Sequence, residues 1–268
     1  MKNKVVIITG GSSGIGKALA VVFGKNGSKV VITGRNTANL EEAANELTAL
    51  GIDNFSFVGD VSNELENDLL VKAVIEKYGK IDVLINNAGL SMRALFADLD
   101  LSVIRKLMDV NFYGTVFATK YALPHILESK GSIVAISSVA GYRGLPARTG
   151  YSASKFAIHG FLESLRTELL KSGVHVLLAC PGFIATNIRN SALTANGQVQ
   201  GDSPLEEKNL MTAEEAATHI YQAVVKRKRD IVLTTQGKLT VWLNKLIPGF
   251  MDGVVYNHFR KEKDSPLK

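Results

Sequence analysis

The sequence predicts an α/β protein of the Rossmann type, in which a doubly wound parallel β-sheet of about seven strands is flanked by helices. Short runs rich in β-branched residues alternate along the chain with longer segments of helical periodicity. The first of these runs are apolar without alternation, as expected where helices cover both faces of a parallel sheet. The expected strands are 5–9, 29–33, 55–58, 81–85, 132–137, 174–179 and 231–234.

Helices are expected between these strands. Residues 14–26, 37–50 and 62–78 have helical periodicity, and each segment begins near a glycine or a residue that caps helix N-termini. A later helix is expected after Thr212, because Glu215 stands three residues further on and completes the pattern of a capping box.

The chain of 268 residues is expected to form a single Rossmann-type domain over residues 1–236, because no linker, repeat or low-complexity segment divides it. Within it, residues 187–209 are polar and rich in glycine, serine and asparagine. A loop of this length usually binds a ligand or covers a site, so residues 187–211 are expected to form a substrate loop. Residues 237–268 are expected to be an extension of the same domain.

The extension carries apolar residues at helical spacing on both sides of Pro248 and Gly249, which predicts two short amphipathic helices. Three roles stay open for these helices: an interface with the body or another subunit, a pocket lid, or peripheral membrane contact aided by nearby basic residues. The apolar positions are Leu239, Trp242, Leu243, Leu246, Ile247, Phe250, Met251, Val254, Val255 and Phe259, and the basic ones are Arg260, Lys261 and Lys263.

Composition excludes several classes of protein. The apolar share of 46% and charged share of 21% are ordinary for a globular protein, and a net charge of +6 over so large a surface does not predict a nucleic-acid partner. Cys180 is the only cysteine, which excludes an internal disulfide and suggests a buried thiol at a strand end. No run approaches the ~20 consecutive apolar residues that span a bilayer, and no signal peptide is recognisable, so a cytoplasmic location is expected.

A glycine-rich turn follows the first expected strand and opens the first expected helix. Gly10, Gly14 and Gly16 permit positive φ angles and remove side chains where the backbone must approach a ligand. The N–H groups at a helix start attract phosphate, so this turn suits the pyrophosphate of a dinucleotide. The spacing is G-x3-G-x-G rather than the commoner G-x-G-x-x-G.

The order of four motifs over residues 4–236 resembles that of the short-chain dehydrogenases/reductases. The glycine turn is similar to the family's nucleotide-binding turn, and three further motifs follow the third, fourth and sixth expected strands: Asp60-Val61, Asn86-Asn87-Ala88-Gly89 and Pro181-Gly182. The resemblance implies that these motifs contact the adenine, the ribose side and the nicotinamide, respectively. The full set of expected cofactor residues is Gly10, Ser12, Ser13, Gly14, Ile15, Gly16, Arg35, Asn36, Asp60, Val61, Asn87, Ala88, Gly89, Tyr151, Lys155, Pro181, Gly182, Ile184 and Thr186.

Tyr151 and Lys155 stand four residues apart at the start of a strongly helical segment, so both side chains point into the same cleft. A carbonyl group that accepts hydride also needs a proton, and a phenol with a pKa of ~10 is a poor proton shuttle at neutral pH. An ammonium group at ~4 Å in an effective dielectric of ~20 supplies about 4 kcal/mol, enough to lower that pKa by about three units. Lys155 is therefore expected to lower the pKa of Tyr151.

The resemblance implies two more catalytic residues. Ser138, at the end of the fifth expected strand, matches the family's serine, which hydrogen-bonds the substrate oxygen. Asn111 matches the fourth member of the family's tetrad, which holds a water for proton relay through Lys155. The implied reaction is interconversion of a ketone or aldehyde and the corresponding alcohol by hydride transfer. A cofactor-sensing binding protein and an NAD-dependent epimerase or dehydratase on a related fold stay open as alternatives.

The cofactor is expected to be NADP(H). Gly34 stands where an NAD-selective fold places an acidic residue, and Arg35 offers a planar fork of donors for a 2′-phosphate. Ser13 departs from the many NADP-preferring relatives that carry a second basic residue there. No metal is expected, because the five histidines show no metal-ligand spacing.

The expected substrate is a small carbonyl or alcohol compound of lipophilic character. The extension is similar to that of lipid- and steroid-active family members, and the residues expected around the substrate look apolar. The resemblance also implies a homodimer or homotetramer. The expected pocket residues, besides the substrate loop, are Ser91, Met92, Phe96, Tyr142 and Leu145.

Overall fold

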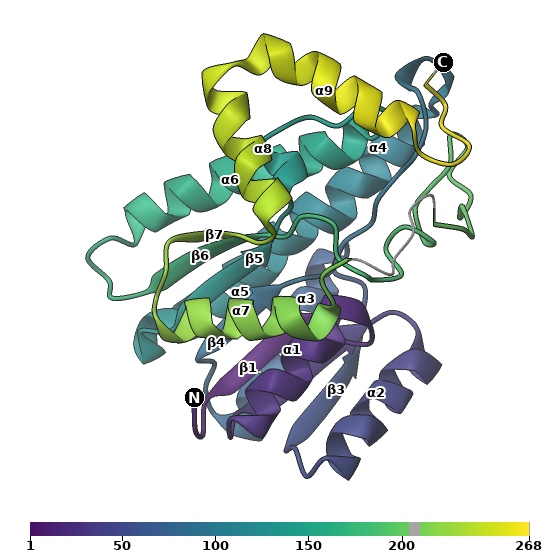
Figure 1. Ribbon diagram of the computed structural model, residues 1–268. Coiled ribbons are helices and arrows are strands. Elements are labelled where there is room, and N and C mark those ends of the chain that lie inside the picture. Colours follow the sequence, from purple (N-terminus) through teal and green to yellow (C-terminus); the bar gives the residue numbers. More distant parts are fainter. Residues whose placement is uncertain (204–209, 268) are drawn as a thin grey trace.

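The computed structural model describes residues 1–203 and 210–267 (Figure 1). In this part of the chain one parallel sheet contains seven strands in the order β3-β2-β1-β4-β5-β6-β7. The predicted doubly wound sheet is therefore confirmed, and the predicted strand ends differ by only one or two residues. The strands are β1 (Val5–Thr9), β2 (Lys29–Gly34), β3 (Asn54–Val58), β4 (Val83–Asn86), β5 (Ser132–Ile136), β6 (His175–Cys180) and β7 (Asp230–Val232).

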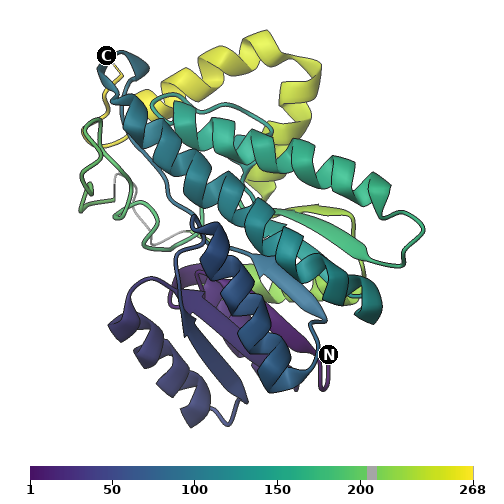
Figure 2. The ribbon, with the colours of Figure 1, turned by 180° about the vertical axis from the view of Figure 1, so that it is seen from behind.

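Helices cover both faces of the sheet. On the face toward the viewer in Figure 1 lie α1 (Gly14–Lys25), α2 (Thr37–Ala49) and α7 (Ala213–Val225). Figure 2 shows α3 (Glu64–Tyr78), α5 (Gly114–Ser129) and α6 (Thr149–Glu168) on the opposite face. Successive side chains of a strand point to opposite faces, so each buried strand contributes to two apolar clusters, one under each helical layer.

Polar caps fix where the helices begin. The side chain of Thr212 accepts a hydrogen bond from Glu215 N, and the Glu215 carboxylate accepts one from Thr212 N, so the predicted capping box is confirmed. The helix expected from residue 62 begins at Glu64 instead, because the Asn63 side chain accepts a hydrogen bond from Leu65 N. The Ser62 hydroxyl bonds the carboxylate of Asp60.

The turn between β1 and α1 requires glycine for two reasons, a positive φ angle and close packing of the backbone. Gly10 and Gly14 have φ angles of +63° and +52°, a region that residues with a side chain rarely adopt. Gly16 has an ordinary φ but no room, since an added Cβ would lie 2.2 Å from the carbonyl oxygen of Gly10. The glycine spacing thus follows from close packing of this turn as well as from ligand access.

The predicted substrate loop leaves the end of β6 and returns to α7. Residues 187–203, the part that the structure describes, contain no helix or regular strand. Leu193 forms isolated bridges with Met92 and Val199, which tie the loop to the segment after β4. Residues 204–209 of the predicted loop lie outside the described residues.

The predicted pair of C-terminal helices is confirmed as α8 (Thr235–Leu246) and α9 (Pro248–Arg260). The two helices lie together at one end of the molecule, beside α6 (Figure 1). One face of α9 is buried through Met251, Val255 and Phe259, which pack against Leu145 and Phe183. A second set of large apolar side chains is exposed: Leu239, Trp242, Leu246, Ile247, Phe250, Val254 and Tyr256. Among the described residues, no helix is long and apolar enough to cross a membrane.

Candidate active site

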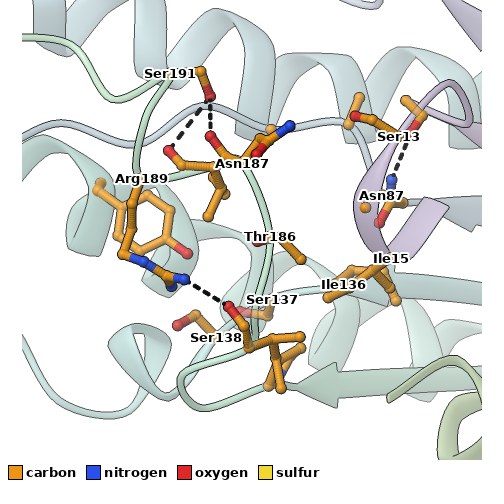
Figure 3. Close-up of a pocket in the computed structure, with 18 of the residues that line it drawn as sticks. Ser13, Ile15, Asn87, Ile136, Ser137, Ser138, Thr186, Asn187, Arg189 and Ser191 are labelled. Carbon is orange, nitrogen blue, oxygen red and sulfur yellow. Dashed lines mark hydrogen bonds between the residues drawn. The ribbon is translucent and has the colours of Figure 1, made fainter. Parts of the chain in front are cut away.

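A cavity of about 240 Å³ opens at the carboxyl ends of β1, β4, β5 and β6. Figure 3 shows Ser13, Ile15 and Asn87 on one side of it and Asn187, Arg189 and Ser191 on the segment that faces them. Fifteen of the residues predicted to bind cofactor or act in catalysis line this cavity: Gly10, Ser12, Ser13, Gly14, Ile15, Asn87, Ala88, Gly89, Ser138, Tyr151, Lys155, Pro181, Gly182, Ile184 and Thr186.

The glycine turn presents the start of α1 to this cavity. Ser13 occupies the N-cap position, and among the described residues its side chain makes no capping hydrogen bond. The first-turn N–H groups of α1 can therefore donate to an anion in the cavity. A Cβ on Gly14 would lie 3.4 Å from Thr186 Cγ2, so the two sides of the cavity approach closely here. These features fit a dinucleotide phosphate.

Six predicted residues do not line the cavity. A Cβ on Gly16 would clash with Gly10, which makes Gly16 a packing residue. Asn36 caps α2, since its side chain accepts a 2.9 Å hydrogen bond from Asn39 N. The others are Arg35, Asp60, Val61 and Asn111.

Arg35 and Asp60 form a neighbouring pair at the ends of β2 and β3. The guanidinium Nη1 of Arg35 lies 3.6 Å from Asp60 Oδ2, and the Arg35 side chain is half exposed. Burial raises the pKa of Asp60, but hydrogen bonds from Ser62 and the charge of Arg35 outweigh it, so the pKa is lowered overall. Asp60 is therefore an anion at neutral pH, and it forms an ion pair with Arg35.

Asn87 holds the glycine turn in place. Its side-chain amide donates to the carbonyl oxygens of Thr9 and Gly10, each at 3.0 Å. The backbone N–H groups of Asn87 and Ala88 both donate to Thr9 Oγ1, also at 3.0 Å. These bonds join the end of β4 to the end of β1, so Asn87 acts on the turn besides lining the cavity.

Tyr151 and Lys155 come from the first turns of α6 and point to the same cavity, as the four-residue spacing predicted. The Lys155 Nζ donates a 2.9 Å hydrogen bond to the carbonyl oxygen of Ile136 at the end of β5. It lies 5.7 Å from the centre of the Tyr151 ring. Because the ammonium is buried, the pKa of Lys155 is lowered to about 8.

The expected lowering of the Tyr151 pKa is not what the structure gives. Burial raises the pKa of Tyr151 above its usual value, although a hydrogen bond with Ser138 and the charge of Arg148 act in the opposite direction. An ammonium group at ~4 Å would lower the pKa of a phenol, but burial of the phenolate in the protein has a cost that acts in the opposite direction. At neutral pH Tyr151 is therefore a protonated phenol, which is the form that donates a proton.

Ser138 follows β5 and opens a short 3₁₀ turn, Val139–Gly141. Its hydroxyl accepts a 3.1 Å hydrogen bond from Ala140 N and is also hydrogen-bonded to Tyr151. The serine and tyrosine hydroxyls consequently face one point in the cavity, where both can reach one oxygen atom of a ligand.

Asn111 lies in a π-helical turn, Met108–Tyr113, between α4 (Leu101–Leu107) and α5. Its amide accepts from Leu90 N at 2.7 Å and donates to Leu90 O at 3.0 Å and Ser154 Oγ at 2.8 Å. Such turns often occur at functional sites, because the extra residue reorients a side chain. Asn111 lies close behind the cavity, since a Cβ on Gly89 would be 3.2 Å from its Oδ1 and 3.7 Å from Lys155 Nζ.

A buried polar cluster lies behind Lys155. His159 Nε2 is 2.8 Å from Ser137 Oγ and 3.7 Å from Cys180 Sγ, and its ring packs edge-on against Tyr142. Burial lowers the pKa of His159 to about 4, helped by the charge of Lys155. Burial also raises the pKa of Cys180 to about 12, so this thiol at the end of β6 stays protonated, as its predicted buried position implied.

A second, more apolar cavity of about 120 Å³ lies next to the first. Ser138 and Gly182 line both cavities, so the two cavities adjoin at these residues. Of the five pocket residues predicted outside the substrate loop, Leu145 alone lines this cavity in the described part of the chain. Its other walls are largely the C-terminal helices: Val139, Phe183, Thr234, Gln236, Gly237, Thr240, Met251, Val254, Val255, His258 and Phe259.

The remaining four predicted pocket residues lie elsewhere. Met92 is fully buried in an apolar cluster with Leu107 and Leu193, and Ser91 beside it is also buried. Phe96 is largely exposed, and Tyr142 packs against His159. The sequence could not identify the residues that line this cavity, because the position of α9 beside the end of β5 depends on long-range contacts.

The sequence matches the short chain dehydrogenase family over residues 4–197. The chain belongs to this family. Mouse "Dehydrogenase/reductase SDR family member 7B" is 37% identical over 273 residues, a match that covers 99% of this chain and 84% of the mouse protein. A "Dehydrogenase/reductase SDR family protein 7-like" from Dictyostelium discoideum is 35% identical over 269 residues, covering 94% and 80%. The protein is thus an oxidoreductase of the short-chain dehydrogenase/reductase class.

Two solved structures have the same fold. A short-chain dehydrogenase/reductase from Burkholderia phymatum in complex with NAD superposes with a TM-score of 0.82 at 26% identity, covering 93% of this chain and 95% of that one. An alcohol dehydrogenase from Thermococcus sibiricus, complexed with 5-hydroxy-NADP, superposes with a TM-score of 0.76 at 24% identity, covering 87% and 96%.

Six lining residues of the first cavity lie outside the predicted cofactor and catalytic residues; four of them fall in the predicted substrate loop, and the two at the end of β5 were not singled out from the sequence. Arg189 donates to Ile184 O at 3.0 Å and to Ser203 Oγ at 3.1 Å, which holds the segment after β6 across the cavity mouth. The position of these residues after β5 and β6 could have identified them, because the carboxyl ends of parallel strands meet at one edge of a sheet. The residues are Ile136, Ser137, Asn187, Ile188, Arg189 and Ser191. Among the described residues, no group of three acidic, histidine or cysteine side chains is placed to hold a metal ion.

The buried His159 predicts an acid-sensitive fold. Because its pKa is about 4 in the folded enzyme and about 6.5 in an unfolded chain, only the unfolded state takes up the proton between these values. The stabilisation is complete above pH 6.5, and up to about 3 kcal/mol is lost as the pH falls to 4. His159→Gln should therefore lose less unfolding free energy than the wild type between pH 7 and 4.5, measured by urea denaturation.

The matched control is His219→Gln, which changes an exposed histidine on α7. This control should follow the wild type. An equal loss in the wild type and in His159→Gln would show that His159 does not cause the acid sensitivity.

Proposed function

We propose that this dehydrogenase/reductase uses NADP(H) to interconvert a lipophilic ketone or aldehyde and the corresponding alcohol by hydride transfer. One observation carries the proposal: the cavity beside the glycine turn and the apolar cavity under α9 meet at Ser138, where Tyr151 also points. If a dinucleotide occupied the first cavity and an apolar substrate the second, their reacting groups would meet near Ser138.

Each catalytic side chain has a defined task in this proposal. The cofactor supplies hydride to the carbonyl carbon, or accepts it from the alcohol carbon in the reverse direction. Tyr151 donates its phenolic proton to the carbonyl oxygen, and the Ser138 hydroxyl hydrogen-bonds the same oxygen as negative charge develops there. Lys155 holds the cofactor ribose, and Asn111 supports a water relay that restores the proton to Tyr151 through Lys155.

The protonation states support the reducing direction. The pKa of Tyr151 is raised by burial, so the phenol carries its proton at neutral pH and is ready to donate it. Oxidation of an alcohol would instead need the phenolate, which burial disfavours. No specific observation favours a cofactor sensor, or an epimerase or dehydratase, over an oxidoreductase.

The position of Arg35 supports NADP(H) as the cofactor. Its guanidinium lies at the carboxyl end of β2, and its partner Asp60 is 3.6 Å away, which leaves donors of the half-exposed fork for a 2′-phosphate. Gly34 before it carries no acid that would repel that phosphate. Of the structural neighbours described above, one binds NAD and the other a modified NADP, so the residues of this chain carry the proposal.

The outward faces of α8 and α9 support a peripheral contact with a membrane surface. Several large apolar side chains on these helices are exposed, Trp242 and Phe250 among them, and the exposed Lys238 and Lys245 of α8 are close to them in the sequence. Apolar groups with flanking lysines suit the surface of an anionic bilayer. The homodimer or homotetramer and the cytoplasmic location expected from the sequence stay predictions.

The first test concerns Tyr151. Tyr151→Phe removes the transferable proton and little else, so kcat for ketone reduction should fall to a few per cent or less while the Kd for NADPH stays within about twofold. Lys155→Ala should lower kcat and also weaken NADPH binding, because Lys155 both passes a proton to Tyr151 and holds the cofactor ribose in this proposal. Tyr113→Phe, on an exposed ring of the π-helical turn, is the control and should match the wild type. A Tyr151→Phe enzyme with substantial kcat would refute the assigned role.

The second test concerns Arg35. A charge-assisted contact with the 2′-phosphate is worth ~1.5 to 3 kcal/mol, which corresponds to roughly tenfold to hundredfold selectivity. Arg35→Ala should raise KM for NADPH by about that factor and hardly change KM for NADH. Arg105→Ala, an exposed arginine on α4, serves as control. Equal wild-type kcat/KM values for the two cofactors would show that the assignment is wrong.

The third test is flotation with anionic phospholipid vesicles. The wild-type enzyme should float with the vesicles, whereas Trp242→Ser/Phe250→Ser should remain at the bottom, because both substituted side chains are exposed. Neutral vesicles should capture less of the wild type, since the lysines then lack a partner. Failure of the wild type to bind anionic vesicles would remove the membrane contact from the proposal.

A further inference from the structure

A buried carboxylate follows the last helix of the chain. Glu262 lies two residues beyond Arg260, the end of α9, and only 2% of its side chain is exposed. Both of its carboxylate oxygens accept hydrogen bonds from Nη2 of Arg148, at 2.8 and 2.9 Å. Acidic side chains are seldom buried this deeply unless they are paired, so the burial of Glu262 depends on its ion pair with Arg148.

A second arginine completes the cluster. Arg93 Nε lies 3.3 Å from Glu262 Oε2, and Arg93 Nη2 donates to the carbonyl oxygen of Lys263. The guanidinium of Arg148 also lies over the ring of Phe259, 4.5 Å from its centre. The end of the chain is therefore held by two cations that come from different parts of the sequence.

Both arginines belong to segments that build the active site. Arg148 immediately precedes α6 and stands three residues before Tyr151, and its charge acts on the Tyr151 phenol. Arg93 lies on the segment after β4, where its backbone N–H bonds the substrate loop at Leu193. The carboxylate of Glu262 thus joins the chain terminus to the catalytic helix and to the segment beside the substrate loop.

Other ion pairs of the C-terminal region are of a different kind. Lys263 and Asp202 are 3.2 Å apart, with side chains 67% and 69% exposed, and Arg143 pairs with a largely exposed Asp252. Exposed pairs of this kind contribute little to stability, whereas a buried pair leaves an uncompensated charge when one partner is removed. Burial already lowers the pKa of Arg148, and the neighbouring Glu262 opposes that shift.

The cluster holds the wall of the apolar cavity in place. Met251, Val255 and Phe259 stand one helical turn apart on α9, and all three line the cavity next to Ser138. Phe259 is also the ring against which Arg148 lies. Any movement of Glu262 away from the arginines would carry this wall with it.

We propose that Glu262 is a positioning residue that fixes α9 as the wall of the substrate pocket and so gives the enzyme its preference for lipophilic carbonyl compounds. The inference rests on the proposed carbonyl reduction. Glu262 itself touches neither substrate nor cofactor in this proposal. It acts through Phe259, Val255 and Met251, whose apolar contacts a long substrate needs and a very small one does not.

The test compares Glu262→Gln with Asp252→Asn in the full-length enzyme. Asp252→Asn also removes an ion pair of the α9 region, but one whose carboxylate is largely exposed, and is the matched control. KM and kcat are measured with NADPH for octan-2-one and butan-2-one, and the Kd of octan-2-one is measured by calorimetry in the presence of NADP+. Glu262→Gln should raise KM and Kd for octan-2-one at least tenfold, with less than a twofold change for butan-2-one and in kcat. Asp252→Asn should match the wild type.

The outcomes separate the inference from the reaction. Equal octan-2-one values in Glu262→Gln and the wild type, or an equal loss for both ketones, would overturn the role of Glu262 while leaving ketone reduction standing. If the wild type reduces neither ketone, the proposed reaction is wrong, and the Kd values alone decide the role of Glu262. If Glu262→Gln does not fold, the test uses Arg93→Gln, which keeps the pair between Glu262 and Arg148. Arg93→Gln should weaken octan-2-one binding about threefold. An unchanged Kd for octan-2-one would overturn the inference.

Discussion

Parallel strand pairing is the constraint on which the whole candidate site depends. Because β1, β4, β5 and β6 run in the same direction, their carboxyl ends meet at one edge and deliver the glycine turn, Asn87, Ser138 and Pro181 to one cavity. The bonds from Asn87 to Thr9 and Gly10 then lock two of these ends together. Side chains more than a hundred residues apart in the sequence become neighbours through backbone geometry alone.

Burial, rather than pairing with a single opposite charge, sets the protonation states at this edge. It raises the pKa of Tyr151, lowers that of Lys155 to about 8, and lowers that of His159 to about 4. Each shift favours the neutral form, as expected where a charge would leave water. The site therefore combines a protonated phenol with a lysine that titrates near neutrality, and both groups can hold or pass on a proton.

The sequence predicted what local patterns encode. Apolar runs and turns predicted the seven strands, and the four-residue spacing placed Tyr151 and Lys155 in the same cavity. It did not predict the raised pKa of Tyr151, because the distance of Lys155 and the degree of burial depend on tertiary packing. It also predicted Met92 and Phe96 around the substrate, but neither residue lines the apolar cavity under α9. That cavity is walled by α9, which packs against the distant Leu145 and Phe183, and no local pattern predicts such long-range contacts.

The two C-terminal helices show why an amphipathic pattern leaves several roles open. Residues at helical spacing divide into a buried row, Met251, Val255 and Phe259, and exposed residues that include Trp242 and Phe250. Periodicity identifies both sets as apolar but does not tell which one faces the body. The buried row lines a cavity at Ser138, so the inward side of α9 belongs to the proposed substrate pocket, while the outward side is exposed. The same short segment can therefore shape the pocket and contact a surface that supplies apolar molecules, since the two tasks use opposite faces.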